Sequence, residues 1–172
     1  FDDKGLLEAV FERDGKKIGP KKLKTLIEKK SALYLPIIRE KLKFFPGVLD
    51  FIRQVSKKYS LAVVSGALRN EIDFALKEGK VEACFDVIIA ADDTKHGKPD
   101  PEGFVLALAK LKAKNPEIRP DNCLVLEDSQ AGIIAAHQAG MKVAALTHTY
   151  GAVELKEADF IWDSFQSLPY RF

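Results

Sequence analysis

Two rhythms of apolar and polar residues divide the 172-residue chain near residue 43. Before this point, apolar residues recur every three or four positions, first from Leu6 to Phe11 and again from Leu23 to Ile38. This spacing is typical of one side of an α-helix, and the intervening RDGKKIGP has the Gly and Pro content of a turn. Residues 1–43 are therefore predicted to form a helical segment.

From Phe44 onward, short apolar runs alternate with helical patterns. The runs, each typical of a buried strand, are SLAVVS, FDVIIA, NCLVLE, KVAAL and FIW, and helices are predicted at residues 48–58, 70–78, 101–114 and 129–139. This alternation indicates an α/β fold, in which helices cover both faces of a parallel sheet in three Rossmann-like layers. Residues 44–172 are predicted to form this core.

The charge balance argues against a nucleic acid or a membrane as the partner. The net charge is only +2, and no apolar run approaches the ~18 residues of a membrane span. The lysines that crowd the first third of the chain are interpreted as a solvated helix face, of which one or two could contact an anionic substrate. Cys84 and Cys123 lack metal-ligand spacing and favour a reducing, cytoplasmic setting, with one disulfide left open.

Candidate functional residues are found where the predicted strands end, because parallel strands end at the same edge of a sheet. Ser65 and Gly66 close the first predicted strand, where a hydroxyl and an unhindered backbone N–H can bind a phosphate oxygen. Ser-Gly is also ordinary turn chemistry, and this alternative stays open.

The second predicted strand leads into a charged loop, DDTKHGKPDPEG. Asp100 and Pro101 suit the N-cap and the first position of the next helix. Lys98 lies between glycine and proline, so we expect its ammonium to face the strand ends and neutralise phosphate or carboxylates. Three other residues are predicted to be solvated rather than metal ligands: Asp92, Asp93 and His96.

The third predicted strand ends in two adjacent acids, Glu127 and Asp128. Two carboxylates repel each other unless a cation lies beside them, and Mg²⁺ prefers such hard oxygen ligands together with water and phosphate. A Mg²⁺ site is therefore predicted here. The alternative is that Asp128 or Ser129 only caps the following helix.

The order of these motifs resembles that of the haloacid dehalogenase superfamily of phosphatases and phosphomutases. The motifs are Ser65, then Lys98 within GKPDP, then the acid pair within EDSQAG. The EDSQAGI form and the later AGM look most like the β-phosphoglucomutase-like branch and its sugar-phosphate phosphatase relatives. The resemblance runs from about residue 44 to the end, and residues 1–43 resemble part of that family's helical cap.

The resemblance implies an aspartate nucleophile that accepts the phosphoryl group, and a second aspartate two residues later as general acid and base. Ser65 and Gly66 would bind the phosphoryl oxygens, and Lys98 would offset their charge. Glu127 and Asp128 would hold Mg²⁺.

The family's cap selects the substrate, which the resemblance implies is a small phosphorylated metabolite. Lys30 matches a cap position where a basic residue meets the substrate, and Arg69 is a second candidate. The identity of the metabolite and the oligomeric state are left open by the sequence.

The opening FDDKGLL does not fit the family's nucleophile motif, an apolar strand followed by DxDGT. Lys4 stands at the general-acid position, and a lysine is cationic near neutral pH. Acids in a first turn followed by helical spacing instead favour a cap helix over a degenerate catalytic loop. We therefore expect that this chain lacks the first strand of its core, between the Ser65 and Glu127 strands, and is part of a longer protein.

A Mg²⁺-dependent phosphatase acting on small phosphate esters, such as sugar phosphates, is the predicted function. A phosphomutase that uses the same aspartyl-phosphate and a non-catalytic binding domain are the alternatives. The chain has no G-x-G-x-x-G or Walker-type loop, which argues against dinucleotide and P-loop chemistry.

Overall fold

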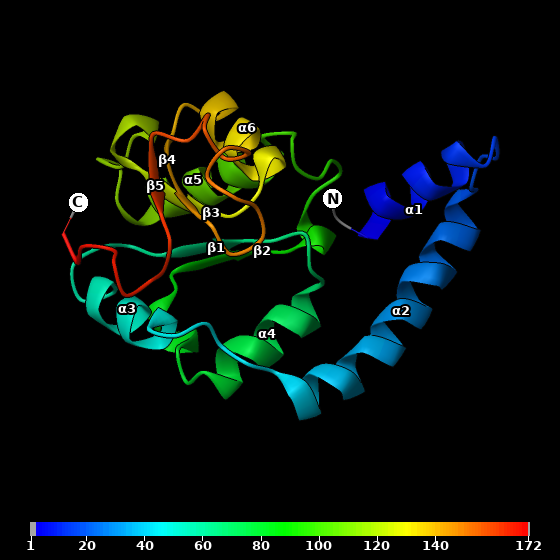
Figure 1. The fold of residues 1–172 in the computed structure, drawn as a ribbon, viewed down its shortest axis with the longest axis horizontal. Helices are drawn as coiled ribbons and strands as arrows, with labels where there is room; N and C mark the ends of the chain where they lie inside the picture. Colours follow the sequence, from blue (N-terminus) through cyan, green and yellow to red (C-terminus); the bar gives the residue numbers. More distant parts are fainter. Residues whose placement is uncertain (1–2, 172) are drawn as a thin grey trace.

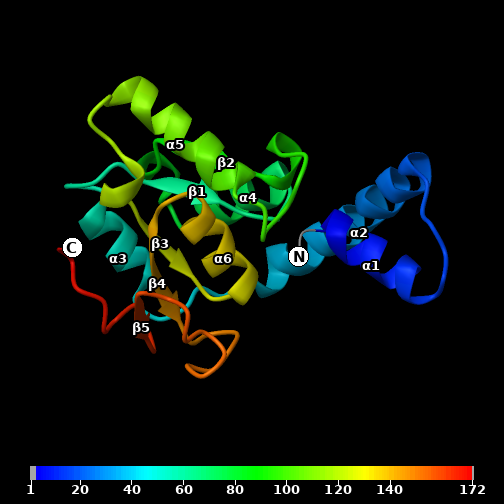
Figure 2. The ribbon, with the colours of Figure 1, turned by 90° about the horizontal axis from the view of Figure 1, so that it is seen from above.

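The computed structural model describes residues 3–171 of the chain. It begins with two helices, α1 (Asp3–Arg13) and α2 (Pro20–Lys41), which pack together and lie to one side of the remaining fold (Figures 1 and 2). The helix at Asp3 confirms the helical interpretation of the opening stretch from that residue on, whereas Phe1 and Asp2 lie outside the described residues.

The rest of the fold alternates between helices and strands, as predicted. The helices are α3 (Val48–Val55), α4 (Arg69–Glu78), α5 (Glu102–Lys114) and α6 (Gln130–Gln138). The strands are β1 (Ala62–Val64), β2 (Val87–Ile89), β3 (Leu124–Glu127), β4 (Lys142–Leu146) and β5 (Phe160–Trp162). Short 3-10 helices span Glu82–Cys84, Ala91–Asp93 and Pro120–Asn122. Every strand pair is parallel, which confirms the predicted α/β fold.

Five helix boundaries differ from the prediction by one to three residues. α4 begins at Arg69 instead of residue 70, and α6 spans Gln130–Gln138 instead of residues 129–139. α3 ends at Val55 instead of residue 58. α5 begins at Glu102, because the Asp100 carboxylate accepts the backbone N–H of Glu102 at 2.9 Å and Pro101 precedes the first helical residue. Asp100 therefore satisfies an N–H of the first turn, although the helix starts one residue later than expected.

The parallel strands fall into two sheets. β1 pairs with β2, placing Val64 opposite Ile89, and β4 lies between β3 and β5, with Glu127 opposite Ala145. Within residues 3–171, no strand joins β1 to β3. Each of these two strands therefore has one edge without a strand partner in this part of the chain.

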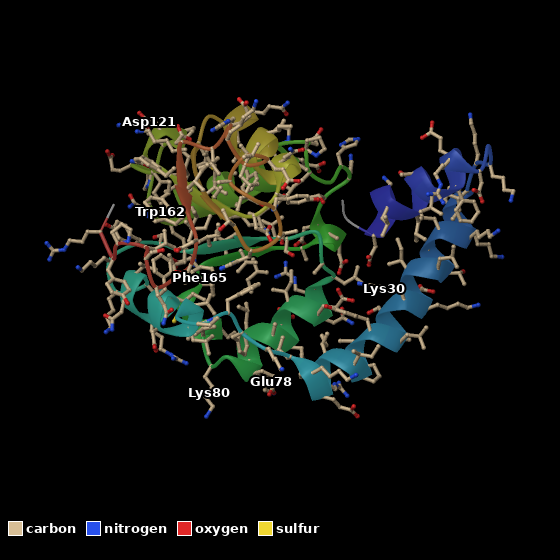
Figure 3. The ribbon with its side chains drawn as sticks, viewed as in Figure 1. Lys30, Glu78, Lys80, Asp121, Trp162 and Phe165 are labelled. Atoms are coloured by element: carbon tan, nitrogen blue, oxygen red, sulfur yellow. The ribbon has the colours of Figure 1, made fainter. Side chains whose placement is uncertain are left out.

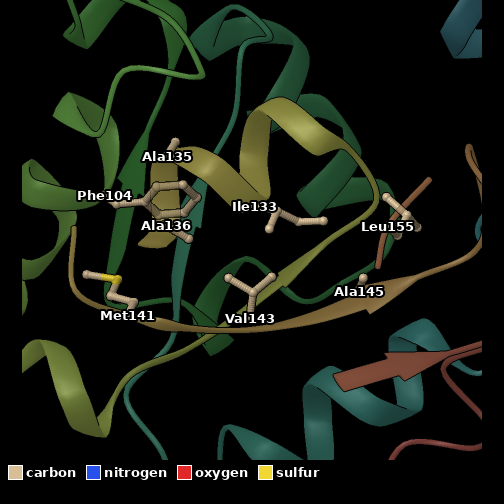
Figure 4. Close-up of a cluster of buried hydrophobic side chains, with 8 residues drawn as sticks. All are labelled: Phe104, Ile133, Ala135, Ala136, Met141, Val143, Ala145 and Leu155. Carbon is tan, nitrogen blue, oxygen red and sulfur yellow. The ribbon is translucent and has the colours of Figure 1, made fainter. Parts of the chain in front are cut away.

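Apolar helix faces cover the strands from two sides, with α5 and α6 on one side and α3 and α4 on the other (Figure 1). The largest buried cluster joins α5 and α6 to β4 (Figure 4) and contains Phe104, Ile133, Ala135, Ala136, Met141, Val143, Ala145 and Leu155. A second cluster joins α3 to β4 through Phe51, Val55 and Leu146. The alanines on α6 let this helix lie close to the strand. No helix among the described residues combines the length and the apolar character that a membrane crossing requires.

Candidate active site

The carboxyl ends of β1 and β3 and the loop after β2 surround one pocket of about 190 Å³. Its lining includes all five residues that the sequence marked for phosphate and metal binding: Ser65, Gly66, Lys98, Glu127 and Asp128. The structure thus brings together side chains that lie more than sixty positions apart in the sequence. Parallel strand ends explain this convergence.

Lys98 connects the two sheets at the floor of this pocket. Its ammonium donates to the backbone carbonyl of Val64 at 3.2 Å, at the end of β1, and forms an ion pair with the carboxylate of Glu127, at the end of β3. The Phe104 ring lies 5.1 Å from the ammonium and adds a cation–π contact. The lysine therefore holds the ends of two strands that do not pair with each other.

Glu127 is buried, and three donors fix its carboxylate. Besides Lys98, the backbone N–H of Asp128 (3.2 Å) and the hydroxyl of Ser129 (3.0 Å) donate to it. Gly132 makes room for this group, because a Cβ atom at that position would lie 2.0 Å from the carboxylate carbon of Glu127. The glycine is thus required by a close approach of α6 to the acid.

Asp128 is not the cap of α6. The Ser129 hydroxyl accepts the backbone N–H of Gly132 at 3.1 Å and takes that role, so one of the two capping alternatives is removed. The Asp128 carboxylate lines the pocket and accepts the hydroxyl of Thr149 at 2.5 Å. Thr149 follows β4, the strand next to β3, and a hydroxyl after that strand was the signal that the sequence reasoning missed.

The Ser65 hydroxyl takes part in the turn that the alternative reading described. It accepts the backbone N–H of Ala67 at 3.1 Å, while the backbone N–H of Ser65 donates to Ile89 at 3.0 Å. An oxygen that accepts one hydrogen bond still carries its own hydrogen. The side chain can therefore shape the turn and donate to a ligand in the pocket.

The two predicted substrate contacts, Lys30 and Arg69, do not line this pocket. Arg69 donates to the backbone carbonyl of Ile88 at 2.8 Å and to Asp93 at 2.5 Å. Lys30, on the side of α2 that faces α4 (Figure 3), pairs with Glu71 at 3.1 Å. Both cations have carboxylate partners within the chain.

Asp93, predicted to be a solvated loop residue, is exposed and also forms hydrogen bonds within the chain. Its carboxylate accepts the backbone N–H of Ala90 at 2.8 Å and binds Arg69. The Ala90 N–H, followed by the charge and hydrogen bond of Arg69, lowers the pKa of Asp93. Asp92 also takes part, because it accepts the backbone N–H of Arg69 at 3.3 Å.

His96 has more acidic neighbours than the sequence suggested. Ligand atoms of His96, Asp100 and Glu102 lie within 4.8 Å of one another. However, the Glu102 carboxylate accepts the backbone N–H groups of Lys95 (3.1 Å) and His96 (2.9 Å), which lowers the pKa of Glu102. These hydrogen bonds stabilise the loop that carries Lys98.

The donor set suits a divalent cation. Glu127 and Asp128 contribute two negative charges and Lys98 one positive charge, so these three residues alone would repel a phosphate group. Mg²⁺ beside the carboxylates would reverse the sign of the local charge, and carboxylate oxygens are the ligands that it prefers. The residues present therefore fit Mg²⁺.

Comparisons with known proteins agree with this geometry. The model of a family described as "Haloacid dehalogenase-like hydrolase" matches residues 5–146. Validoxylamine A 7'-phosphate phosphatase from Streptomyces hygroscopicus subsp. limoneus is 36% identical over 116 residues, which cover 67% of this chain and 52% of that protein. The chain thus spans about half the length of this curated relative.

Two solved structures have a similar fold. The β-phosphoglucomutase from Clostridium difficile is 26% identical with a TM-score of 0.83, covering 98% of this chain and 74% of that one. CbbY from Rhodobacter sphaeroides, solved in complex with phosphate, is 27% identical with a TM-score of 0.82, covering 97% and 75%.

Proposed function

Because this chain belongs to the haloacid dehalogenase-like hydrolase family, we propose that its protein is a Mg²⁺-dependent phosphatase of small phosphate esters such as sugar phosphates. The observation that carries the proposal is the convergence of Ser65, Lys98 and the Glu127–Asp128 pair on one pocket. A hydroxyl, an ammonium and two carboxylates supply the donors, the positive charge and the metal ligands that phosphoryl transfer requires.

In the proposed complex, the Ser65 hydroxyl and the Gly66 backbone N–H donate to oxygens of the phosphoryl group. The Lys98 ammonium offsets the negative charge that these oxygens carry through the reaction. Its contacts with Val64 and Glu127 hold it at the strand ends, so little reorganisation is needed when the substrate binds.

Glu127 and Asp128 would hold the metal ion, which screens the phosphoryl charge from the attacking carboxylate when it is bound. The Ser129 hydroxyl orients Glu127, and the Thr149 hydroxyl orients Asp128. Such outer contacts fix the direction of metal-ligating carboxylates.

The nucleophile is proposed to be an aspartate on a parallel strand between β1 and β3, outside residues 3–171. Support comes from the free edges of these two strands and from Lys98, which spans their ends. One carboxylate oxygen of that aspartate attacks phosphorus, the ester P–O bond breaks, and a general acid protonates the departing alkoxide. Water then attacks the aspartyl-phosphate, which releases inorganic phosphate and restores the carboxylate.

A phosphomutase is the second candidate, favoured by the likeness to the β-phosphoglucomutase structure. Both reactions share the aspartyl-phosphate, and they differ in whether water or a second sugar hydroxyl accepts the phosphoryl group. A sugar 1-phosphate substrate separates them, because a mutase returns a sugar 6-phosphate and a phosphatase releases inorganic phosphate.

The test is a Mg²⁺-dependent screen of phosphate esters with the full-length protein and with Asp128→Asn. We expect turnover that requires Mg²⁺ and falls about 100-fold in the variant, because a ligand carboxylate becomes a neutral amide. Unchanged turnover would refute the metal assignment. Binding of phosphate and Mg²⁺ without any turnover would instead favour a non-catalytic domain.

A further inference from the structure

The helices α1 and α2 contact the loop that leads to Lys98 and the first turn of α4, which follows the Ser65 loop. The Lys4 ammonium on α1 donates to the backbone carbonyl of Lys95 at 3.1 Å, in the loop that leads to Lys98. The Lys30 ammonium on α2 pairs with Glu71 in the first turn of α4, which follows the Ser65 loop. The helical segment is therefore tied to one loop of the proposed phosphate site and to the helix that follows the other.

Glu71 is a buried carboxylate that accepts hydrogen bonds from two different elements. Its side chain is only 3% exposed, and one of its oxygens accepts the Lys30 ammonium at 3.1 Å. The other oxygen accepts the backbone N–H of Leu68 at 3.2 Å, at the N-terminus of α4. The residue thus connects α2 to the end of the loop that begins at Ser65.

Lys30 joins three helices at one ammonium group. Besides Glu71 on α4, it lies 3.1 Å from the Asp3 carboxylate on α1 and 4.4 Å from the centre of the Tyr34 ring. Burial acts to lower the pKa of Lys30, but the hydrogen bonds and charges of Asp3 and Glu71 outweigh it and raise the pKa. Lys30 is therefore charged throughout the neutral range.

A short series of hydrogen bonds leads from Lys30 to the pocket. Glu71 fixes Leu68, and the next residue toward the pocket, Ala67, donates its backbone N–H to the Ser65 hydroxyl at 3.1 Å. The backbone carbonyl of Ala67 also accepts the N–H of Ala91 at 3.0 Å. The loop from Ser65 to Leu68 is thus held at both ends.

We propose that Lys30 and Glu71 are positioning residues that fix the Ser65 loop for phosphate binding, and that Lys30 acts through Glu71 rather than by touching the phosphate. The inference rests on the proposed function, since it assigns these residues to the same phosphate site. Removal of the Lys30 charge leaves a buried carboxylate without its cation, which is unfavourable unless the loop rearranges. Removal of both charges avoids that penalty, because glutamine at position 71 can still accept the Leu68 N–H.

The experiment measures two quantities in the full-length protein: the affinity for inorganic phosphate in the presence of Mg²⁺, and the hydrogen-exchange rate of residues 66–71. In Lys30→Met we expect about tenfold weaker phosphate binding and about tenfold faster exchange. The double variant Lys30→Met/Glu71→Gln should lose less phosphate affinity and less protection from exchange than Lys30→Met alone. Lys30→Arg should keep both close to the values of the unaltered protein. Lys29→Met, which removes the neighbouring exposed lysine, is the matched control and should change neither.

Several outcomes would overturn the inference. Weaker phosphate binding in Lys30→Met with unchanged exchange of residues 66–71 would mean that Lys30 meets the anion directly. A double variant that loses as much as Lys30→Met would show that the buried charge of Glu71 is not the cause. If the unaltered full-length protein binds no phosphate, the proposed function fails, and unchanged exchange in the variants would then separately refute the positioning role.

Discussion

The helical segment α1–α2 and the α/β core differ in how they bury apolar residues. In the segment only Leu23 and Ser31 are buried, and apolar side chains such as Leu33, which is 72% exposed, face outward. In the core, β4 buries all four of its apolar residues, and α6 buries Ala135, Ala136 and Ile133, the last only 1% exposed. A third buried cluster joins β2 to α5 through Val87, Ile89, Ala107 and Leu111, and none of the three clusters includes a residue of α1 or α2.

This contrast separates two kinds of stability. The core is held by apolar packing, where free energy depends on volume and fit. The helical segment is joined to the core by polar contacts at Lys4, Lys30 and Ser31, so its position depends on charge and hydrogen bonding. Substitutions that change side-chain volume should therefore mainly alter the stability of the core. Substitutions that change charge should mainly alter the junction, meaning the polar contacts of Lys4, Lys30 and Ser31 with the core.

The largest expected effect comes from a matched pair of truncations. Ile133→Ala should lower the free energy of unfolding by about 2–5 kcal/mol, because it leaves a cavity under α6. Leu33→Ala on exposed α2 should change it by less than about 0.5 kcal/mol. Chemical denaturation of both variants measures the difference. Equal losses would mean that α2 is as tightly packed as the core, contrary to this comparison.

A second pair of variants adds a methyl group, whereas the first pair truncates a side chain. In a helix interior alanine is favoured over glycine by about 1 kcal/mol, yet Gly132→Ala should destabilise the core by about 1–3 kcal/mol. The reason is that the new Cβ would collide with the Glu127 carboxylate, so Mg²⁺-dependent phosphate binding should weaken as well.

Gly19→Ala, before α2, is the control for this pair, since a Cβ there meets no atom within 4 Å. Thermal unfolding and phosphate titration of both variants provide the measurement. A more stable Gly132→Ala protein with intact phosphate binding would show that the close approach of α6 to Glu127 is unimportant.

The smallest expected effect is a difference in pH response. The Val143 N–H and then His137 lower the pKa of Asp159, so its contribution to core stability is present above its ordinary pKa of 3.8 and is lost as the pH falls through the lowered value. The pKa of Lys30 is raised above its ordinary value of 10.5. The stability that Lys30 gives to the contact between α2 and α4 is therefore present below that pH and is lost as the pH rises further.

Thermal unfolding between about pH 5 and about pH 3 should therefore show a shallower loss of stability in Asp159→Asn than in the unaltered chain. The protection of residues 66–71, measured as their exchange rate relative to the intrinsic rate at each pH, should fall only in alkaline solution, and Lys30→Met should remove that pH-dependent fall. An Asp159→Asn protein with the same acid response as the unaltered chain would contradict the first expectation.

Much of the fold could be predicted from the sequence, because strand and helix signals are local. Continuous apolar runs such as KVAAL mark buried strands, and the acid pair that begins at the last residue of β3 marks its carboxyl end. The start of α5 was predicted one residue early, since Asp100 and Pro101 suit a cap equally well in two neighbouring registers.

The partners of long charged side chains could not be predicted in this way. Lys30 and Arg69 pair with Glu71 and Asp93, which lie at least twenty positions away in the sequence, and only the packing of α4 against α2 and the loop after β2 decides this. The Thr149 contact with Asp128 likewise depends on β4 lying beside β3. Local patterns locate an element, whereas these contacts require the assembled fold.

The division of the strands into two sheets has a consequence for handling the chain in solution. A bare strand edge can recruit an extended segment from a neighbouring molecule and so start intermolecular association. β1 and β3 each present such an edge among residues 3–171. The Lys98 ammonium at their ends is paired with Glu127, so it gives these edges no net charge that would discourage such association, and concentrated samples of the chain should be prone to precipitate.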